Sequence, residues 1–78
     1  MSSRATLEFI VSCLVDNPDD VHIAQETSGK TVIYDLTVHA DDIGKVIGRG
    51  GRTARAIRTV VKAAALREDR NAIVEILD

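Results

Sequence analysis

The fold and the function of this chain both depend on one segment, residues 46–57, which reads VIGRGGRTARAI. Gly48 and Gly51 bracket two residues between a short apolar run and a longer helical pattern. Glycine at both ends permits a tight turn and leaves no Cβ to hold a ligand away. The turn opens a helix, whose first N–H groups lack intrahelical partners and whose dipole favours anions. Arg49 and Arg52 add positive charge there, so the segment has the properties of a phosphate-binding loop.

Two familiar nucleotide-binding motifs do not fit this loop. A Walker loop requires the pattern GxxxxGK[ST], but Val46 stands at its first glycine and Arg52 at its lysine. The dinucleotide fingerprint GxGxxG needs a glycine where this chain has Thr53, and a strand directly before the turn. A small nucleotide-binding enzyme is therefore the disfavoured hypothesis.

Charge is distributed unevenly along the 78 residues, although the net charge is only −2. Residues 43–67 carry seven basic and no acidic side chains, whereas residues 1–42 carry two basic and eight acidic ones. A basic window inside an acidic protein favours a local positive field that faces an anion. From charge alone, a solvated basic helix face explains the same counts equally well.

Hydrophobic periodicity and turn residues predict six elements in the order α-β-β-α-α-β. The expected ranges are a helix over 3–17, strands over 21–27 and 31–39, a short helix that carries Ile43, Val46 and Ile47, a long helix over about 52–67 and a strand over 71–77. We expect Asn17-Pro18 to end the first helix and Asp41 or Asp42 to cap the short one.

The connections between these elements predict the sheet. A helical crossover joins parallel strands in a right-handed unit, so the last strand should pair parallel with the second. A short glycine connection at Ser28-Gly29-Lys30 makes the first two strands an antiparallel hairpin. The expected fold is α+β, with a three-stranded mixed sheet covered on one face by three helices. The length predicts one domain over residues 1–78.

The glycine segment resembles the VIGxxGxxxxI signature of the KH domain, with Val46, Ile47 and Ile57 at its apolar positions. The order of elements is that of the type II, prokaryotic KH arrangement. Length and the opening helix are most similar to the small bacterial KhpA-like family. The resemblance implies a non-enzymatic protein without a cofactor that binds single-stranded RNA, as an RNA chaperone or post-transcriptional regulator.

The resemblance also implies where RNA binds. The GRGG loop, defined as Gly48, Arg49, Gly50 and Gly51, would clamp about four unpaired nucleotides. Lys45, Arg52 and Arg55 would line the phosphate side, and the bases would lie in a groove between the two helices and the second strand. The expected groove residues are Ile43, Ile47, Ile57, Leu36 and Val38, and the sequence does not divide them between groove and core. The hairpin connection matches the variable loop of the family and predicts a low wall.

The long helix has three faces on a helical wheel. Its expected core arc is Ile57, Val60, Val61 and Ala64, and its basic arc is Arg52, Arg55, Arg58 and Lys62. A stripe between them, Ala56, Thr59, Ala63 and Leu66, could seat a second helix. An alanine-rich surface helix selected for its propensity is the alternative.

We expect this stripe to form a homodimer, as is known in the resembling family. That family also implies a heterodimer with a larger KH-containing RNA-binding protein. A rival hypothesis is a protein-interaction or scaffold module that uses the long helix and binds RNA only weakly and incidentally.

Other chemistry is not indicated. The single cysteine, Cys13, excludes an internal disulfide and favours a reducing, cytoplasmic setting. His22 and His39 lie on different strands without ligand spacing, so no metal site is expected. No apolar run has membrane length and no signal peptide is evident. We expect Phe9 and Cys13 at the margin of the first helix, and Tyr34 in the core.

Overall fold

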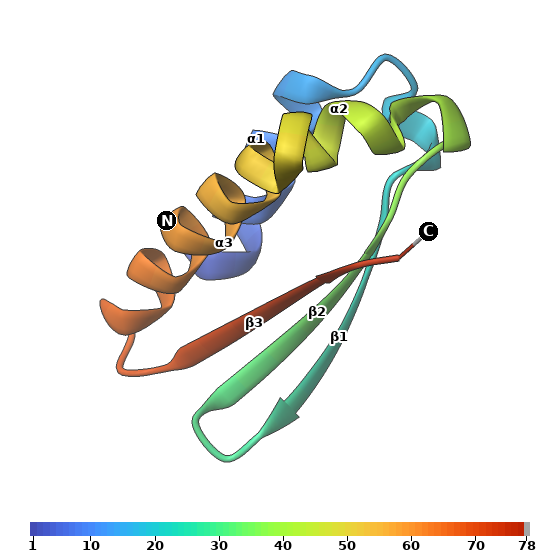
Figure 1. Ribbon diagram of the computed structural model, residues 1–78. Helices are drawn as coiled ribbons and strands as arrows, with labels where there is room; N and C mark the ends of the chain where they lie inside the picture. The colour runs from blue at the N-terminus through green and yellow to red at the C-terminus, as the bar shows by residue number, and fades with distance from the viewer. Residues whose placement is uncertain (78) are drawn as a thin grey trace.

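A computed structural model describes residues 1–77, and in it three helices lie on one face of a three-stranded sheet (Figure 1). The helices are α1 (Ser3–Leu14), α2 (Ile43–Ile47) and α3 (Arg52–Leu66), and the strands are β1 (His22–Ser28), β2 (Thr31–Thr37) and β3 (Asn71–Ile76). Short 3₁₀ turns are η1 (Pro18–Asp20), η2 (Ala40–Asp42) and η3 (Arg49–Gly51). The expected order of elements and the fold class are confirmed.

The sheet has the order β1-β2-β3, with β1 antiparallel and β3 parallel to β2. Ser28 pairs with Thr31, so Gly29 and Lys30 alone form the hairpin turn. On β2, Val32, Tyr34 and Leu36 are buried under the helices, in strict alternation with less buried neighbours. Because β2 is hydrogen-bonded on both sides, β1 and β3 form the two edges of the sheet.

The core lies between this sheet and the helices, as the alternation on β2 requires. It contains Leu7, Val11, Val15, Val32, Tyr34, Leu36, Val38, Val46, Ile57, Val61, Ala65, Ala72 and Val74. Tyr34 is buried as expected, and its hydroxyl shares a 2.6 Å hydrogen bond with the Ser3 hydroxyl. This bond gives the buried phenol the polar partner that it requires.

Helix α1 is three residues shorter than the sequence predicts. It ends at Leu14, and Val15 is extended, with φ −91° and ψ 153° and its side chain in the core. The next two N–H groups, of Asp16 and Asn17, donate to the Asp42 carboxylate instead of continuing the helix. The chain therefore leaves the helix before Pro18, because a distant side chain captures its backbone donors.

The expected core arc of α3 is confirmed at Ile57 and Val61 but wrong at Val60, and Ala64 is only half-buried. The buried residues are Ala54, Ile57, Val61 and Ala65, whereas Val60 is 47% exposed. The two alanines carry a weak hydrophobic signal, so the wheel gave too much weight to Val60. Their small side chains let α3 lie close to α1 and β3, which are its main neighbours.

Candidate nucleic-acid interface

The GRGG loop joins α2 to α3 through an unusual backbone. Gly48, Gly50 and Gly51 all have positive φ, of 75°, 64° and 76°. Gly48 donates its N–H to the Gly44 carbonyl and ends α2, and its own carbonyl accepts from Gly51. Gly51 is the N-cap of α3 and makes no side-chain capping bond. Glycine is the residue that adopts these conformations without strain.

The glycines of the loop have different surroundings. A Cβ at Gly48 would lie 2.2 Å from the Thr53 hydroxyl oxygen, so this position packs against the first turn of α3. A Cβ at Gly50 or Gly51 would meet no heavy atom within 4 Å. One end of the loop is therefore closed against the fold, while its tip is open to a ligand backbone.

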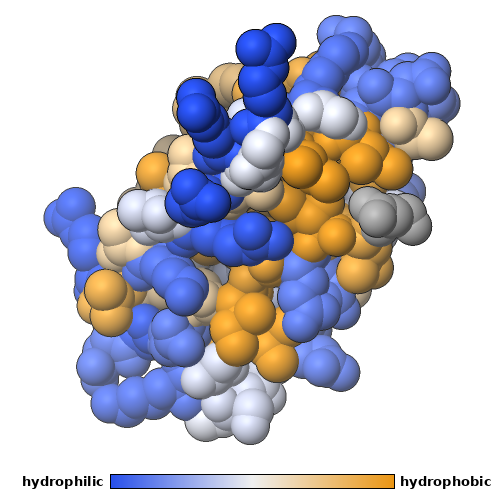
Figure 2. All heavy atoms as spheres, viewed as in Figure 1, coloured by the Kyte–Doolittle hydropathy of each residue, from blue (hydrophilic) through white to orange (hydrophobic). Residues whose placement is uncertain are grey.

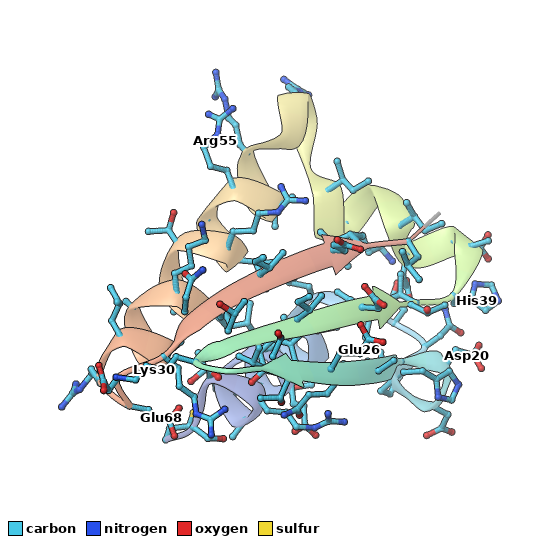
Figure 3. The ribbon with its side chains drawn as sticks, turned by 90° about the horizontal axis from the view of Figure 1, so that it is seen from below. Asp20, Glu26, Lys30, His39, Arg55 and Glu68 are labelled. Carbon is cyan, nitrogen blue, oxygen red and sulfur yellow. The ribbon has the colours of Figure 1, made fainter. Side chains whose placement is uncertain are left out.

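The expected phosphate-side arginines, Arg49, Arg52 and Arg55, are all exposed. Within residues 1–77, none of them forms an ion pair or a side-chain hydrogen bond. Figure 3 shows Arg55 projecting from α3 away from the sheet. These guanidinium groups are free to meet an anion beside the loop.

The structure divides the expected groove residues into two groups. Ile43 and Ile47 of α2 are half-buried and retain surface, whereas Leu36 and Ile57 are core residues at 0% and 2% exposure. Val38 is 7% exposed, so in this conformation it too belongs mainly to the core. Figure 2 shows hydrophobic side chains gathered over α2 and the end of β3, beside hydrophilic ones over α3.

The strand that borders this surface is β3, which corrects the expectation of the second strand. β2 is central and buried, while β3 is an edge and packs against α3. Asn71 and Leu77 donate their N–H groups to Lys30 and Leu36, so the N–H and C=O groups of Ala72, Val74 and Ile76 point to the free edge. The predicted strand order already implied this, since it placed the second strand in the centre.

Arg58 covers part of that free edge. Its Nε donates to the Val74 carbonyl at 3.1 Å. Sequence reasoning placed Arg58 in a basic arc and missed this contact. A charged side chain over an edge carbonyl also hinders unwanted strand pairing.

Lys45 does not fit its expected place on the phosphate side. Its ammonium group pairs with Asp16 and, at 3.3 Å, with Asp42. The hydrogen bond that Lys45 donates to Asp16 raises the pKa of Lys45, and the bond to Asp42 adds to this against the opposing effect of desolvation. Lys45 therefore faces the end of α1, and its charge is already compensated within the chain.

The expectation that Asp41 or Asp42 caps the short helix is also wrong in its detail. Asp42 occupies the N-cap position of α2 but makes no capping bond. Its carboxylate is fully buried and accepts hydrogen bonds from Asp16, Asn17 and Lys45. The side-chain cap is instead on the preceding turn η2, where the Nδ1 of His39 accepts from the Asp41 N–H at 3.0 Å.

The hairpin turn does not form a wall near the loop. Figure 1 shows the β1–β2 turn at the opposite end of the molecule from the connection between α2 and α3. Lys30 in this turn pairs with Asp69, after α3. The short connection therefore has no bearing on the height of a groove beside the GRGG loop.

The expected dimer stripe is exposed along its whole length. Ala56, Thr59 and Ala63 are exposed, and Leu66 is 70% exposed. Val60 adds a second large apolar side chain that sequence reasoning assigned to the core. The stripe is thus broader and more apolar than predicted.

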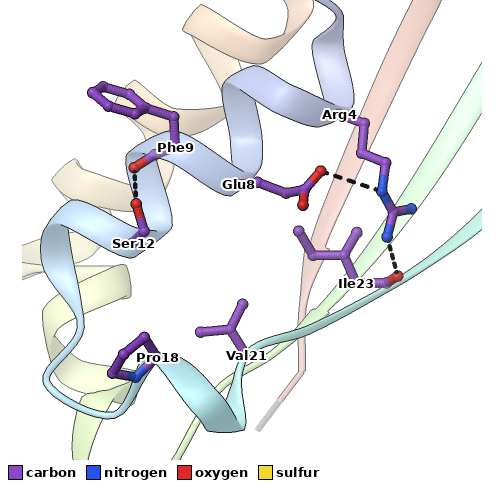
Figure 4. A pocket seen from close by; sticks show the side chains of 7 residues that line it. All are labelled: Arg4, Glu8, Phe9, Ser12, Pro18, Val21 and Ile23. Carbon is purple, nitrogen blue, oxygen red and sulfur yellow. Dashed lines mark hydrogen bonds and ion pairs between the residues drawn. The ribbon is translucent and has the colours of Figure 1, made fainter.

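A separate shallow pocket of about 440 Å³ lies between α1 and β1 (Figure 4). Phe9, which was expected at a helix margin, stands at its rim and is 61% exposed, and Cys13 is exposed as well. Arg4 crosses the pocket, pairs with Glu8 and donates to the Ile23 carbonyl at 3.1 Å. This pocket is not near the loop, and none of the expected site residues lines it.

Within residues 1–77, no group of three or more His, Cys, Asp or Glu side chains is arranged to hold a metal ion. None of the helices in this range combines the length and hydrophobicity needed to cross a bilayer.

The fold is found in a solved structure of distant sequence. The Era protein of Aquifex aeolicus, in its crystal structure with GDP and AlF4−, superposes with a TM-score of 0.65 at 12% identity. The match covers 95% of this chain and 29% of the Era chain. At this identity the likeness concerns the fold alone.

Sequence comparison gives nearer relatives. The RNA-binding protein KhpA of Clostridium perfringens is 49% identical over 95% of this chain and 99% of its own length. KhpA of Caldanaerobacter subterraneus is 52% identical over 91% of this chain and 95% of its own, and KhpA of Streptomyces coelicolor is 50% identical over 90% and 89%. These names describe RNA-binding proteins rather than enzymes, which confirms the expectation of a non-enzymatic chain. The KH domain of KhpA and KhpB matches residues 4–76. The chain therefore belongs to the KhpA/KhpB family of KH domains.

Proposed function

We propose that this protein binds single-stranded RNA through the GRGG loop. The observation that carries the proposal is the loop itself, whose tip is open to a ligand and flanked by three unpaired arginines. Backbone N–H groups at the start of α3 and nearby guanidinium groups are suited to phosphate oxygens. The names of the relatives, which are RNA-binding proteins, support the same ligand.

The bases would lie against Ile43 and Ile47, between α2 and the edge of β3. Neither aromatic residue is available there, since Tyr34 is buried and Phe9 lies on another face. Base stacking on aromatic rings contributes roughly 1–3 kcal/mol per base in other single-strand binders. Without it, a single domain should bind weakly. With about three phosphate contacts, the logarithm of affinity should fall with the logarithm of salt at a slope near −2.

The direct test is a titration with a short unpaired RNA. Changing Arg49→Asp and Gly50→Asp together places two carboxylates at the tip, where Gly50 has open space around it. We expect binding to fall by more than about tenfold, because phosphate contacts give way to like-charge repulsion. Circular dichroism should show that the fold is retained.

The hairpin turn offers a matched control. Gly29 also has positive φ with open space around it, and Lys30 is an exposed basic residue beside it. The double change Gly29→Asp and Lys30→Asp alters the charge equally at the opposite end of the molecule. If this control lowers affinity as much as the loop variant, the GRGG loop is not the binding site.

We propose further that two copies associate through the exposed stripe of α3. Linking two weak sites raises the effective concentration of the second and compensates for weak single-site binding. Replacing Leu66 by Asp places a charge in the stripe and should yield monomers in sedimentation velocity. Lys62→Asp, on the basic arc, is the control and should leave association unchanged. If the wild-type protein is monomeric at high concentration, the proposal that two copies associate through α3 is wrong.

The same surface is available to a larger KH-containing RNA-binding protein, as the expected heterodimer requires. The role we propose is that of an RNA chaperone or post-transcriptional regulator in the cytoplasm. Crosslinking in cells, with identification of bound transcripts and copurified proteins, tests both points. A scaffold that binds RNA only incidentally predicts instead that the loop variant keeps its cellular activity while Leu66→Asp loses it.

A further inference from the structure

Asp42 is an unusual residue for so small a domain. Within residues 1–77, Asp42 and Ser3 are the two buried polar residues, and Asp42 is fully buried. Its Oδ1 accepts from the Asp16 N–H at 3.2 Å and from the Lys45 ammonium at 3.3 Å. Its Oδ2 accepts from the Asn17 N–H at 3.0 Å and the Asn17 side-chain amide at 3.2 Å. A buried charge is tolerated only when it is hydrogen-bonded and paired in this way.

These contacts join two elements that are distant in sequence. Asp16 and Asn17 follow the end of α1, whereas Asp42 directly precedes α2. Helix α2 has five residues, too few for a helix that is stable without tertiary contacts. Its position is therefore set by the burial of Val46 and by the bonds of Asp42 at its start.

The GRGG loop is mechanically continuous with α2. Gly48 is the C-cap of this helix and donates its N–H to Gly44, two residues after Asp42. A displacement of the start of α2 must therefore displace the first glycine of the loop. On its other side this glycine lies so close to the first turn of α3 that a Cβ there would collide with Thr53.

Lys45 belongs to this arrangement and not to the ligand side. With 3.6 residues per turn, Lys45 lies roughly 160° around α2 from both Ile43 and Ile47. Its ammonium group would have to leave a buried carboxylate in order to reach a phosphate. Removal of one partner from such a pair leaves an uncompensated buried charge, which is strongly unfavourable.

We propose that Asp42 is a positioning residue for RNA binding, which holds α2 and the GRGG loop in place from the end of α1, and that Lys45 is its counter-ion and not a phosphate ligand. This inference rests on the proposed function.

The role of Lys45 is tested by the salt dependence of RNA affinity. Loss of a phosphate ligand reduces the magnitude of the salt slope by about 0.7 for single strands. We expect Lys45→Gln to lower the melting temperature and leave the slope unchanged. Arg49→Gln is the matched comparison and should reduce the slope. An equal reduction in the Lys45 variant would overturn the counter-ion assignment.

The role of Asp42 is tested with Asp42→Asn, measured at 10 °C so that the protein is folded. The amide keeps the shape but turns a donor toward groups that are themselves donors. We expect Kd for a short unpaired RNA to rise at least about threefold, since the loop must be re-ordered on binding. The amide resonances of Gly48–Gly51 should shift in the free protein, and the salt slope should stay the same.

Ser3→Ala is the control for stability alone. It removes the other buried polar contact, to Tyr34, at the far end of α1. We expect it to lower the melting temperature while Kd and the loop resonances stay as in the wild type. If Asp42→Asn behaves like Ser3→Ala, Asp42 is structural only and the proposal is wrong.

Should Asp42→Asn not fold, Asn17→Ala removes a single donor to the same carboxylate and must shift the loop resonances in the same direction, or the proposal fails. Should wild-type protein not bind RNA, the proposed function fails, whereas the loop resonances of the free variants still report whether Asp42 positions the loop.

Discussion

The side of the molecule that carries the GRGG loop differs from the open face of the sheet, which no helix covers, in both charge and backbone exposure (Figure 3). Arg49, Arg52 and Arg55 surround an open loop on the first side. On the open face, Asp35 lies directly beside Glu75, and Glu26 is on the neighbouring strand. The neighbouring Asp35 carboxyl group is the main cause that raises the pKa of Glu75, and burial and the charge of Glu26 act in the same direction.

The difference explains how a protein of net charge −2 can bind a polyanion. The three arginines around the loop and the three carboxylates of the open face are on separate surfaces, so the field near the loop is positive although the total charge is negative. The open face, by contrast, repels phosphate. A bound strand should therefore be oriented toward the loop before it makes any specific contact.

The largest effect on stability and on RNA binding is expected when a side chain is introduced at the first glycine of the loop. Gly48→Ala forces a side chain into a conformation of φ 75° and ψ 173° and against Thr53. Non-glycine residues in such regions cost roughly 1–3 kcal/mol, and the contact adds to this. We expect a large loss of stability in chemical denaturation, together with loss of RNA binding.

Gly50→Ala is the comparison within the same loop. Its φ of 64° carries strain, but the added methyl group meets nothing within 4 Å. We expect a smaller loss of stability, of about 1 kcal/mol. Equal losses at Gly48 and Gly50 would contradict the distinction between the closed end of the loop and its open tip.

The loop and the order of elements could be predicted because their signals are local. Two glycines, a basic flank and the periodicity of the strands are each visible within a few residues. The strand order then followed from the handedness of one crossover. The contacts of Asp42 could not be predicted in this way, because they depend on how the residues after α1 pack against the start of α2. The ion pairs of Lys45 with Asp16 and Asp42 could not be predicted for the same reason.

The errors on α3 have a different origin. Val60 and Ala65 lie about 140° apart on the wheel, on opposite flanks of the arc formed by Ile57 and Val61, and hydrophobicity favours valine for the core. The structure buries Ala65 and exposes Val60, because close packing of helices selects small residues. Sequence periodicity predicts that the helix has a buried face, but it locates the centre of that face only to within about one residue position.

The next effect is on the pH dependence of stability. It has opposite signs for Glu75 on the open face of the sheet and for Asp42 at the start of α2. The folded protein holds the proton of Glu75 more tightly than the unfolded chain does, so stability should fall as pH rises above 4.5 through the raised pKa. Glu75→Gln should remove this fall from a series of melting temperatures. A fall that persists in the variant would mean that another group causes it.

For Asp42, the change of stability with pH has the opposite sign. Burial alone would raise its pKa, but the N–H groups of Asp16 and Asn17, the Asn17 amide and Lys45 lower it to about 2 from 3.8. The unfolded chain then binds this proton more readily, so stability should be lost as pH falls from 3.8 toward 2. Where it folds, Asp42→Asn should flatten the acid side of the curve, while Glu75→Gln should leave it unchanged.

The smallest effect is expected from the charge of the open face on RNA affinity. Glu26→Gln removes one negative charge from the sheet, and Arg55→Gln removes one positive charge from the side of the loop. At physiological salt the Debye length is about 8 Å, so a charge across the sheet is largely screened from a strand bound at the loop. Glu26→Gln should therefore change Kd by less than about twofold at this salt, and Arg55→Gln by more, because we propose that Arg55 contacts a phosphate directly. At low salt the Glu26 variant should bind more tightly than wild type, since screening is then weak. If the two variants change Kd equally at physiological salt, the open face takes part in binding and the separation of the two surfaces is not what orients the RNA.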